Sequence, residues 1–182
     1  PAATTYFERS LAAAEAPGNT ELQARVASNL GVSHELLGAF AKGLEYYDQS
    51  YRLSEARRDE RLAAYNQANA GALRIWNGID PDRGLRDVEN ALAVVRRLEA
   101  KNFELLCLQA LAAFHRFAGD YDAAEIELNR ALAIATELGD RADLTSLALH
   151  RARLQIDTGS YGAAIGTLSD GEDEEWGARR GE

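Results

Sequence analysis

Apolar residues recur along this chain with the three-to-four-residue spacing of amphipathic helices. In the stretch 121–138, polar residues such as Glu125 and Arg130 take the other side of the helix. The apolar side of that stretch comprises Tyr121, Ala124, Ile126, Leu128, Ala131, Leu132 and Ala135. No stretch alternates with a period of two between turn signals, so the pattern predicts no strands.

Turn-forming residues divide the chain into nine predicted helices. Pro17-Gly18-Asn19 and Gly119-Asp120 are typical breaks. Asp80, Asp120 and Ser160 are expected to cap the helices that follow them. The predicted helices are 3–16, 20–37, 41–56, 60–77, 82–99, 102–118, 121–138, 141–158 and 161–169. The short loops between them make neighbouring helices antiparallel.

A short pattern recurs every 40 or 41 residues, at Phe7, Tyr47, Val88, Leu128 and Leu168. Four residues before each stands a small residue: Ala3, Gly43, Gly84, Ala124 and Ala164. An upstream pair repeats in step: Leu30-Gly31, Gly71-Ala72, Leu111-Ala112 and Arg151-Ala152. A fixed period of this length is typical of a solenoid, whose units bury their cores by stacking. The prediction is an all-α solenoid domain over 1–169, with about four and a half repeats.

Small residues are expected where two helices cross closely. Gly31 and Ala72 on the first helix of a pair should face Gly43 and Gly84 on the second. Aromatic residues should then fill the wedge to the next pair, namely Phe40, Tyr47, Tyr121 and Tyr161.

These residues resemble the tetratricopeptide repeat. Leu30-Gly31, His34, Gly38-Ala39-Phe40, Gly43, Tyr47 and Ser50 form one unit; Leu111-Ala112, His115, Gly119-Asp120-Tyr121, Ala124, Leu128 and Ala131 form another. The common form repeats every 34 or so residues. The longer period here is similar to the long-helix variant of bacterial signalling ATPases, transcription activators and kinesin-light-chain-like scaffolds. The resemblance covers 3–169 and implies a right-handed α-α superhelix of about nine antiparallel helices.

Composition and charge argue against nucleic-acid and membrane binding. The net charge of −9 argues against nucleic-acid binding, which needs a basic surface. Apolar runs are far shorter than the roughly 20 residues that span a bilayer, and we expect no membrane contact. The single cysteine, Cys107, cannot form an internal disulfide, which favours a reducing, cytoplasmic location. The first 20 residues are interpreted as an amphipathic helix rather than a signal peptide.

The segment 170–182 changes character. Glu172-Asp173-Glu174-Glu175 is an acidic run between Gly171 and Gly177. We predict a solvated, disordered tail, and an acidic docking tail is the alternative.

Candidate chemistry is sparse. His34 and His115 occupy the same place in two repeats and are interpreted as core or groove-edge residues. No Cys/His spacing suggests zinc, no glycine-rich loop suggests phosphate binding, and Cys107 is expected to be an inert buried thiol. We therefore expect no catalytic residues, no metal, no cofactor and no enzymatic activity.

A surface remains. The family resemblance implies that the first helix of each pair lines a concave groove for a peptide or protein partner. The groove residues would be Arg25, Asn29, Asn66, Asn69, Trp76, Gln109, Arg116 and Arg153. Amide side chains can hold an extended peptide backbone, and arginine can fork onto a carboxylate. The carboxylate-clamp pattern of chaperone-binding members is not matched, because Ser28 and Val32 stand where it has Lys and Asn.

The sequence therefore predicts a non-enzymatic protein-interaction module within a larger bacterial regulatory or signalling protein. A structural or oligomerisation segment with an unused groove is the alternative. Helix 3–16 carries the second-helix pattern without a first-helix partner. We expect further repeats, a second copy or the chain's own tail to cover its apolar stripe.

Overall fold

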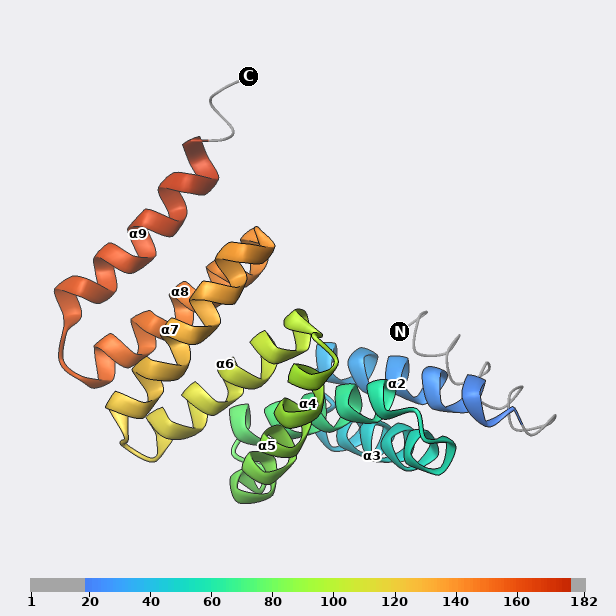
Figure 1. Cartoon of the computed structure of the whole chain (residues 1–182). Coiled ribbons are helices and arrows are strands. Elements are labelled where there is room, and N and C mark those ends of the chain that lie inside the picture. Colours follow the sequence, from blue (N-terminus) through green and yellow to red (C-terminus); the bar gives the residue numbers. More distant parts are fainter. Residues whose placement is uncertain (1–18, 178–182) are drawn as a thin grey trace. The chain divides into compact units, whose positions relative to one another are not determined.

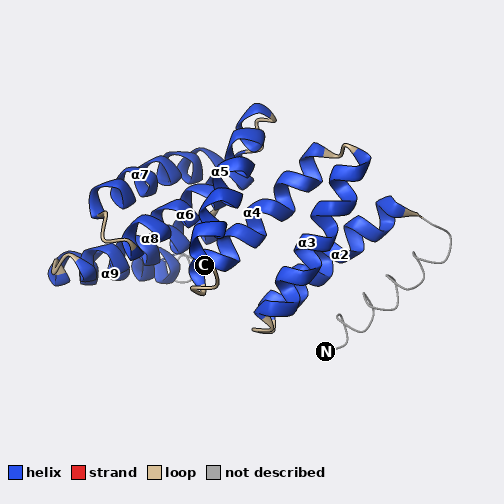
Figure 2. Ribbon diagram, turned by 90° about the horizontal axis from the view of Figure 1, so that it is seen from below, coloured by secondary structure: helices blue, strands red, loops and turns tan. Residues whose placement is uncertain are grey.

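The described part of the protein is entirely helical. The computed structural model describes residues 19–177, and side chains for 19–169. Within them lie eight α-helices and no strand (Figures 1 and 2). The helices are α2 (Thr20–Leu36), α3 (Phe40–Arg57), α4 (Glu60–Trp76), α5 (Pro81–Arg97), α6 (Lys101–Phe117), α7 (Tyr121–Leu138), α8 (Arg141–Asp157) and α9 (Tyr161–Gly177). The all-α prediction is confirmed, and the predicted helix over 3–16 lies outside the described residues.

The last helix is longer than the sequence predicts. α9 continues to Gly177 rather than ending at 169, so part of the acidic stretch is helical. Glutamate has a good helix propensity, and no proline interrupts the segment. Charge alone was therefore a poor sign of a helix end.

The chain divides into two compact units. The first is Pro1–Cys107 and the second is Leu108–Glu182, so the boundary falls inside α6. The first unit holds α2 to α5 and the start of α6, and the second holds the rest of α6 with α7, α8 and α9. The predicted single solenoid domain over 1–169, with an acidic tail beyond it, stays a prediction.

Helix ends are defined by side-chain caps and tight turns. The side chains of Asp80 and Asp120 accept hydrogen bonds from the amides of Arg83 (3.2 Å) and Ala123 (3.1 Å), as predicted. Asn19, Asp59 and Asp140 do the same for α2, α4 and α8. After α2 the chain reverses at Gly38, whose φ of 72° places it in the left-handed region that glycine accommodates. These turns make consecutive helices antiparallel.

The one-residue irregularity of the repeat lies in the connection between α4 and α5. That connection is Asn77–Asp80, whereas Leu37–Ala39 joins α2 to α3 and Ala118–Asp120 joins α6 to α7. Asp80, in this longer connection, has a left-handed backbone conformation with a φ of 53°. The period is therefore 41 across this loop and 40 in the following repeat.

This loop changes the register of the predicted small-residue pairs. A Cβ on Gly31 would meet the ring of Tyr47, and one on Gly71 would meet Val88. The repeating pair in α4 is thus Ala70-Gly71, not Gly71-Ala72. Gly43 faces the carbonyl of Gly31 as predicted, but the residue that faces Gly84 is Gly71 rather than Ala72, at 2.8 Å from Cβ to carbonyl oxygen.

The aromatic wedge forms in the first unit only. Tyr47 is fully buried and packs against Ala70 and Leu73 of α4, with Phe40 at the edge of the same cluster. Figure 1 shows α3 beside α2, and α5 beside α4. The prediction was wrong for Tyr121 and Tyr161, which are 37% and 64% exposed. Both begin a helix, where the tyrosine hydroxyl can remain in water.

Candidate functional site

The predicted groove residues are divided between the two units. In the first unit, Arg25 and Asn29 are exposed on α2. Asn69 and Trp76 of the same unit are half-buried on α4. The second unit holds Arg116, half-buried on α6, and Arg153, exposed on α8.

Two of the predicted amides lie beneath the surface. Asn66 is 0% exposed and donates from Nδ2 to the Leu62 carbonyl at 2.7 Å. Gln109 is 6% exposed. Asn69 donates to the Tyr65 carbonyl at 2.9 Å, so its amide hydrogen is also used inside α4. Short polar side chains often bond back to their own helix, and Asn66 and Gln109 are therefore corrected from groove residues to interior residues.

An open hollow of about 340 Å³ lies in the first unit between the first helices α2 and α4 and the start of α6. It is lined by Glu21, Arg25, Asp59, Arg61, Leu62, Tyr65 and Phe103. The rings of Tyr65 and Phe103 meet at 4.6 Å between centroids, tilted by 59°. Of these residues, only Arg25 was predicted. Tyr65 and Phe103 could have been found from the repeat, because both lie in first helices.

The charges around this hollow are unequally engaged. Arg57 binds Glu21 at 2.9 Å, and Asp59 accepts the Leu62 amide at 3.0 Å. By contrast, neither Arg25 nor Arg61 forms a hydrogen bond or ion pair with any described residue. Burial raises the pKa of Tyr65, so its hydroxyl stays protonated at neutral pH. The hollow thus offers an aromatic floor and two available guanidinium groups.

Sequence reasoning missed a buried charge cluster in the first unit. Arg74 on α4 is 3% exposed. It binds Asp87 of α5 at 2.8 Å and Asp48 of α3 at 3.1 Å. Arg83 binds the same two carboxylates from a more exposed position. Burial raises the pKa of Asp87, and the neighbouring arginines oppose that rise. This cluster joins α3, α4 and α5.

The repeat register explains the cluster. One position of the first helices α2, α4, α6 and α8 holds His34, Arg74, His115 and Gln155, respectively. The matching position of the second helices α3, α5, α7 and α9 holds Tyr46, Asp87, Glu127 and Thr167. His34 stacks on Tyr46 at 5.3 Å between centroids. Gln155 accepts a hydrogen bond from Thr167 at 3.0 Å. This repeat position therefore joins the two helices of a pair through polar or aromatic side chains in α2–α3, α4–α5 and α8–α9.

In the second unit, Arg116 is engaged rather than available. It forms an ion pair with Asp157 of α8 and lies 4.4 Å from the centre of the Phe117 ring. Nearby, burial lowers the pKa of His150 to about 4 together with the positive charges of Arg153 and Arg116. His150 is therefore neutral at physiological pH.

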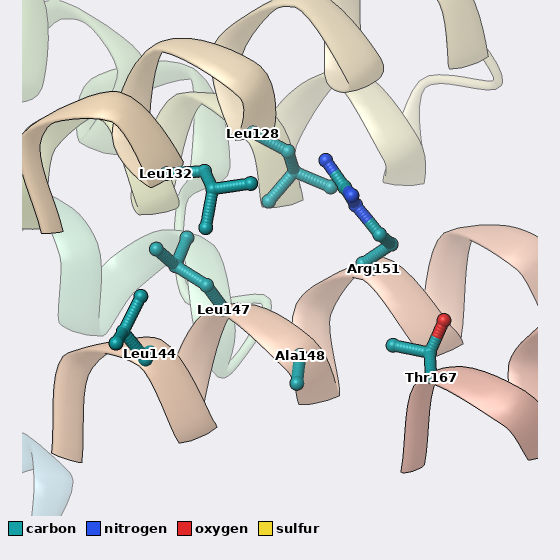
Figure 3. Close-up of a pocket in the computed structure, with 7 residues that line it drawn as sticks. All are labelled: Leu128, Leu132, Leu144, Leu147, Ala148, Arg151 and Thr167. Carbon is teal, nitrogen blue, oxygen red and sulfur yellow. The ribbon is translucent and has the colours of Figure 1, made fainter. Parts of the chain in front are cut away.

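A second, smaller hollow of about 120 Å³ lies among α7, α8 and α9 (Figure 3). Its walls are Leu128, Leu132, Leu144, Leu147, Ala148, Arg151 and Thr167. Figure 3 shows the Arg151 side chain extending beside Leu128, with Leu132 and Leu147 across from it. The sequence signal for this hollow is Arg151, which stands where the equivalent pairs of α2 and α6 have Leu30 and Leu111.

The described residues include one cysteine, Cys107, which is buried. Across residues 19–169, no group of three or more His, Cys, Asp or Glu side chains could hold a metal ion. Burial raises the pKa of the Cys107 thiol to about 12. None of the helices in the described region is long and apolar enough to cross a membrane.

Comparison with known proteins supports the fold. No protein-family model matches the chain, and no curated protein matches it. Among solved structures, the chain is similar to the crystal structure of BtubC (BKLC) from P. vanneervenii, with a TM-score of 0.73 and 19% sequence identity. The match covers 90% of this chain and 67% of that chain. At this identity the likeness shows an all-helical repeat fold, and the tetratricopeptide resemblance stays an interpretation.

Proposed function

We propose that this chain is a non-enzymatic interaction module that binds an extended peptide on the first-helix surface of its first unit. The hollow between α2, α4 and α6 carries the proposal, because it combines an apolar floor with polar groups at its edge. Ligand sites generally combine an apolar lining with a few polar groups in this way. We further propose that the module belongs to a larger cytoplasmic regulatory or signalling protein.

The charges favour an acidic partner. Glu21 and Asp59 are engaged by neighbouring groups, whereas Arg25 and Arg61 are available. A guanidinium group binds a carboxylate through two parallel hydrogen bonds. Tyr65 and Phe103 offer a surface for an apolar side chain beside that carboxylate. The preferred peptide therefore carries an aromatic or aliphatic residue next to Asp or Glu.

The test is selection from a random peptide display library, followed by calorimetric titration of the selected peptide. Replacing both Arg25 and Arg61 with Ser should weaken binding by about 1.5–3 kcal/mol per lost charged hydrogen bond. Arg86→Ser is the matched control, because Arg86 is an exposed arginine on the second helix α5. Selected peptides that lack acidic residues, or that bind the double variant unchanged, would contradict the proposal.

A packing surface is the second candidate, favoured by apolar exposure in the second unit. Leu149 is 47% exposed, although the equivalent Ser28, Ala68 and Gln109 are 3%, 0% and 6% exposed. On α9, Tyr161 and Ile165 are 64% and 67% exposed. We propose that these residues belong to one exposed apolar patch, a feature that commonly marks an interaction surface. Sedimentation that shows self-association, lost in Leu149→Ser with Ile165→Ser, would favour an oligomerisation role.

A further inference from the structure

One repeat position in the second unit departs from its equivalents. Leu30, Ala70 and Leu111 stand 40 or 41 residues apart on α2, α4 and α6, and they are 0%, 2% and 7% exposed. The same position of α8 holds Arg151, which is half-buried. A charged side chain thus replaces an aliphatic or small core residue at one place in the array.

The substitution leaves space that the first unit fills. There, the ring of Tyr47 packs against Ala70. In the second unit, the smaller Leu128 takes the place of Tyr47, and Arg151 turns its Nη2 to Asn129 Oδ1 at 2.6 Å. The hollow of about 120 Å³ remains between them (Figure 3).

The hollow has an apolar body and a positive edge. Leu132, Leu147 and Ala148 form its walls with Leu128, and Arg151 is its charged member. The Asn129 oxygen that binds Arg151 is neutral. No carboxylate among the described residues pairs with Arg151. A half-buried guanidinium without a counter-charge favours an anionic ligand.

We propose that this hollow binds a small branched aliphatic carboxylate, with its alkyl group among the leucines and its carboxylate on Arg151. An apolar cavity of about 150 Å³ holds benzene, so the space here suits an alkyl group of about four or five carbons. The site lies wholly in the second unit and is independent of the peptide surface proposed for the first.

The probe is 4-methylpentanoate, titrated into the ¹⁵N-labelled chain and followed by amide chemical shifts. Saturable shifts are expected around Leu128, Ala148 and Arg151. The matched probe 4-methylpentanamide has the same alkyl group and no charge, and it should bind about tenfold more weakly or worse, as expected for loss of a charged hydrogen bond. Equal binding of the two probes would overturn the proposal.

Two variants restore residues that the preceding repeat already uses. Arg151→Leu introduces the residue of the equivalent Leu111, and Ala148→Leu introduces that of Leu108, which is 0% exposed. Each should weaken binding at least tenfold, the first by removing the charge and the second by occupying the space with Arg151 intact. The folded helix α6 already has leucine at both equivalent positions, so both variants are expected to fold. If one of them does not, the other still tests the proposal.

Arg130→Leu is the control, because Arg130 is an exposed arginine of α7 in an i,i+3 ion pair with Glu127. It should bind the probe as the parent chain does. Unchanged binding by both Arg151→Leu and Ala148→Leu would overturn the proposal. The proposal would also be overturned if the chain bound an acetylated peptide that ends in leucine but did not bind 4-methylpentanoate.

Discussion

At the scale of single residues, the first unit keeps several polar groups inside its helical core. Arg74 reaches two carboxylates from a buried position, and Tyr47 donates its hydroxyl hydrogen to Glu35 Oε2 at 2.7 Å. Buried charge is tolerated only when partners are present. These contacts therefore define which helix faces can meet.

Arg74 should be indispensable for stability although it touches no ligand surface. Replacing Arg74 with Met leaves Asp48 and Asp87 without their buried counter-charge, and removal of one partner from a buried pair costs about 3–5 kcal/mol. Arg83→Met removes the 48% exposed arginine of the same cluster and should cost at most about 1 kcal/mol. Urea denaturation measures both. If Arg74→Met and Arg83→Met lower the free energy of unfolding equally, the buried position of Arg74 does not make it more important than Arg83.

Glu35 should make stability depend on pH. Burial raises the pKa of Glu35, and the hydrogen bond from Tyr47 opposes the rise only in part. An acid with a raised pKa in the folded state contributes stability below its unfolded pKa of about 4.5, and that contribution is lost as pH rises through the folded pKa. Glu35→Gln keeps an acceptor for Tyr47 and removes the titration.

The measurement is the free energy of unfolding of both proteins from pH 4 to pH 7. The stability of Glu35→Gln relative to the parent chain should increase as pH rises through this window. A constant difference across the window would show that Glu35 does not titrate differently on folding.

Among the helical elements, the two helix pairs of the first unit, α2 with α3 and α4 with α5, owe their close spacing to glycine. In the pair α4 and α5, a Cβ on Gly71 would lie 2.7 Å from Val88 Cγ2 and 2.8 Å from the Gly84 carbonyl oxygen. Glycine within a helix costs roughly 0.5–1 kcal/mol relative to alanine. The close approach of α4 and α5 must offset that cost.

Two glycine-to-alanine substitutions should therefore have opposite signs. Gly71→Ala should destabilise by about 1–3 kcal/mol, because the added methyl group meets backbone as well as side chain. Gly162→Ala, in α9, has no atom within 4 Å of the new Cβ and should stabilise by up to about 1 kcal/mol. Thermal unfolding of both variants provides the measurement. A stabilised Gly71→Ala would disprove the tight crossing.

At the scale of the whole molecule, the two compact units are unequally packed. α4 of the first unit carries ten buried residues, whereas α8 of the second carries three. In repeat proteins, stability is a sum of local and nearest-neighbour terms and need not be uniform. The second unit is expected to open more readily than the first.

Native-state hydrogen exchange can verify this difference. Amides of α4 should exchange more slowly than those of α8, because opening α4 exposes more buried surface. Uniform protection of α4 and α8 would indicate that both units open together.

Local sequence signals were sufficient to predict the helices and their period. Apolar spacing, Asp80 and Asp120 as caps, and the recurrence of Tyr47, Val88 and Leu128 were local signals that need no knowledge of neighbouring helices. The approach of Gly31 to Gly43 was also predicted, because close crossings require small residues. Among the predicted groove residues, Arg25 lines the first-unit hollow, and its role in binding stays a prediction.

Which polar residues face solvent depends on packing between helices and was not predictable from the periodicity. Asn66 and Gln109 share the first-helix pattern with Arg25, yet both are buried. The one-residue loop extension at Asp80 shifts the register of Gly71, and Arg151 leaves a hollow instead of filling a core position. Each outcome depends on the size and direction of side chains in adjacent helices, which helical periodicity does not contain. Burial and ligand access are therefore properties of the packed array, although the helices themselves are properties of the chain.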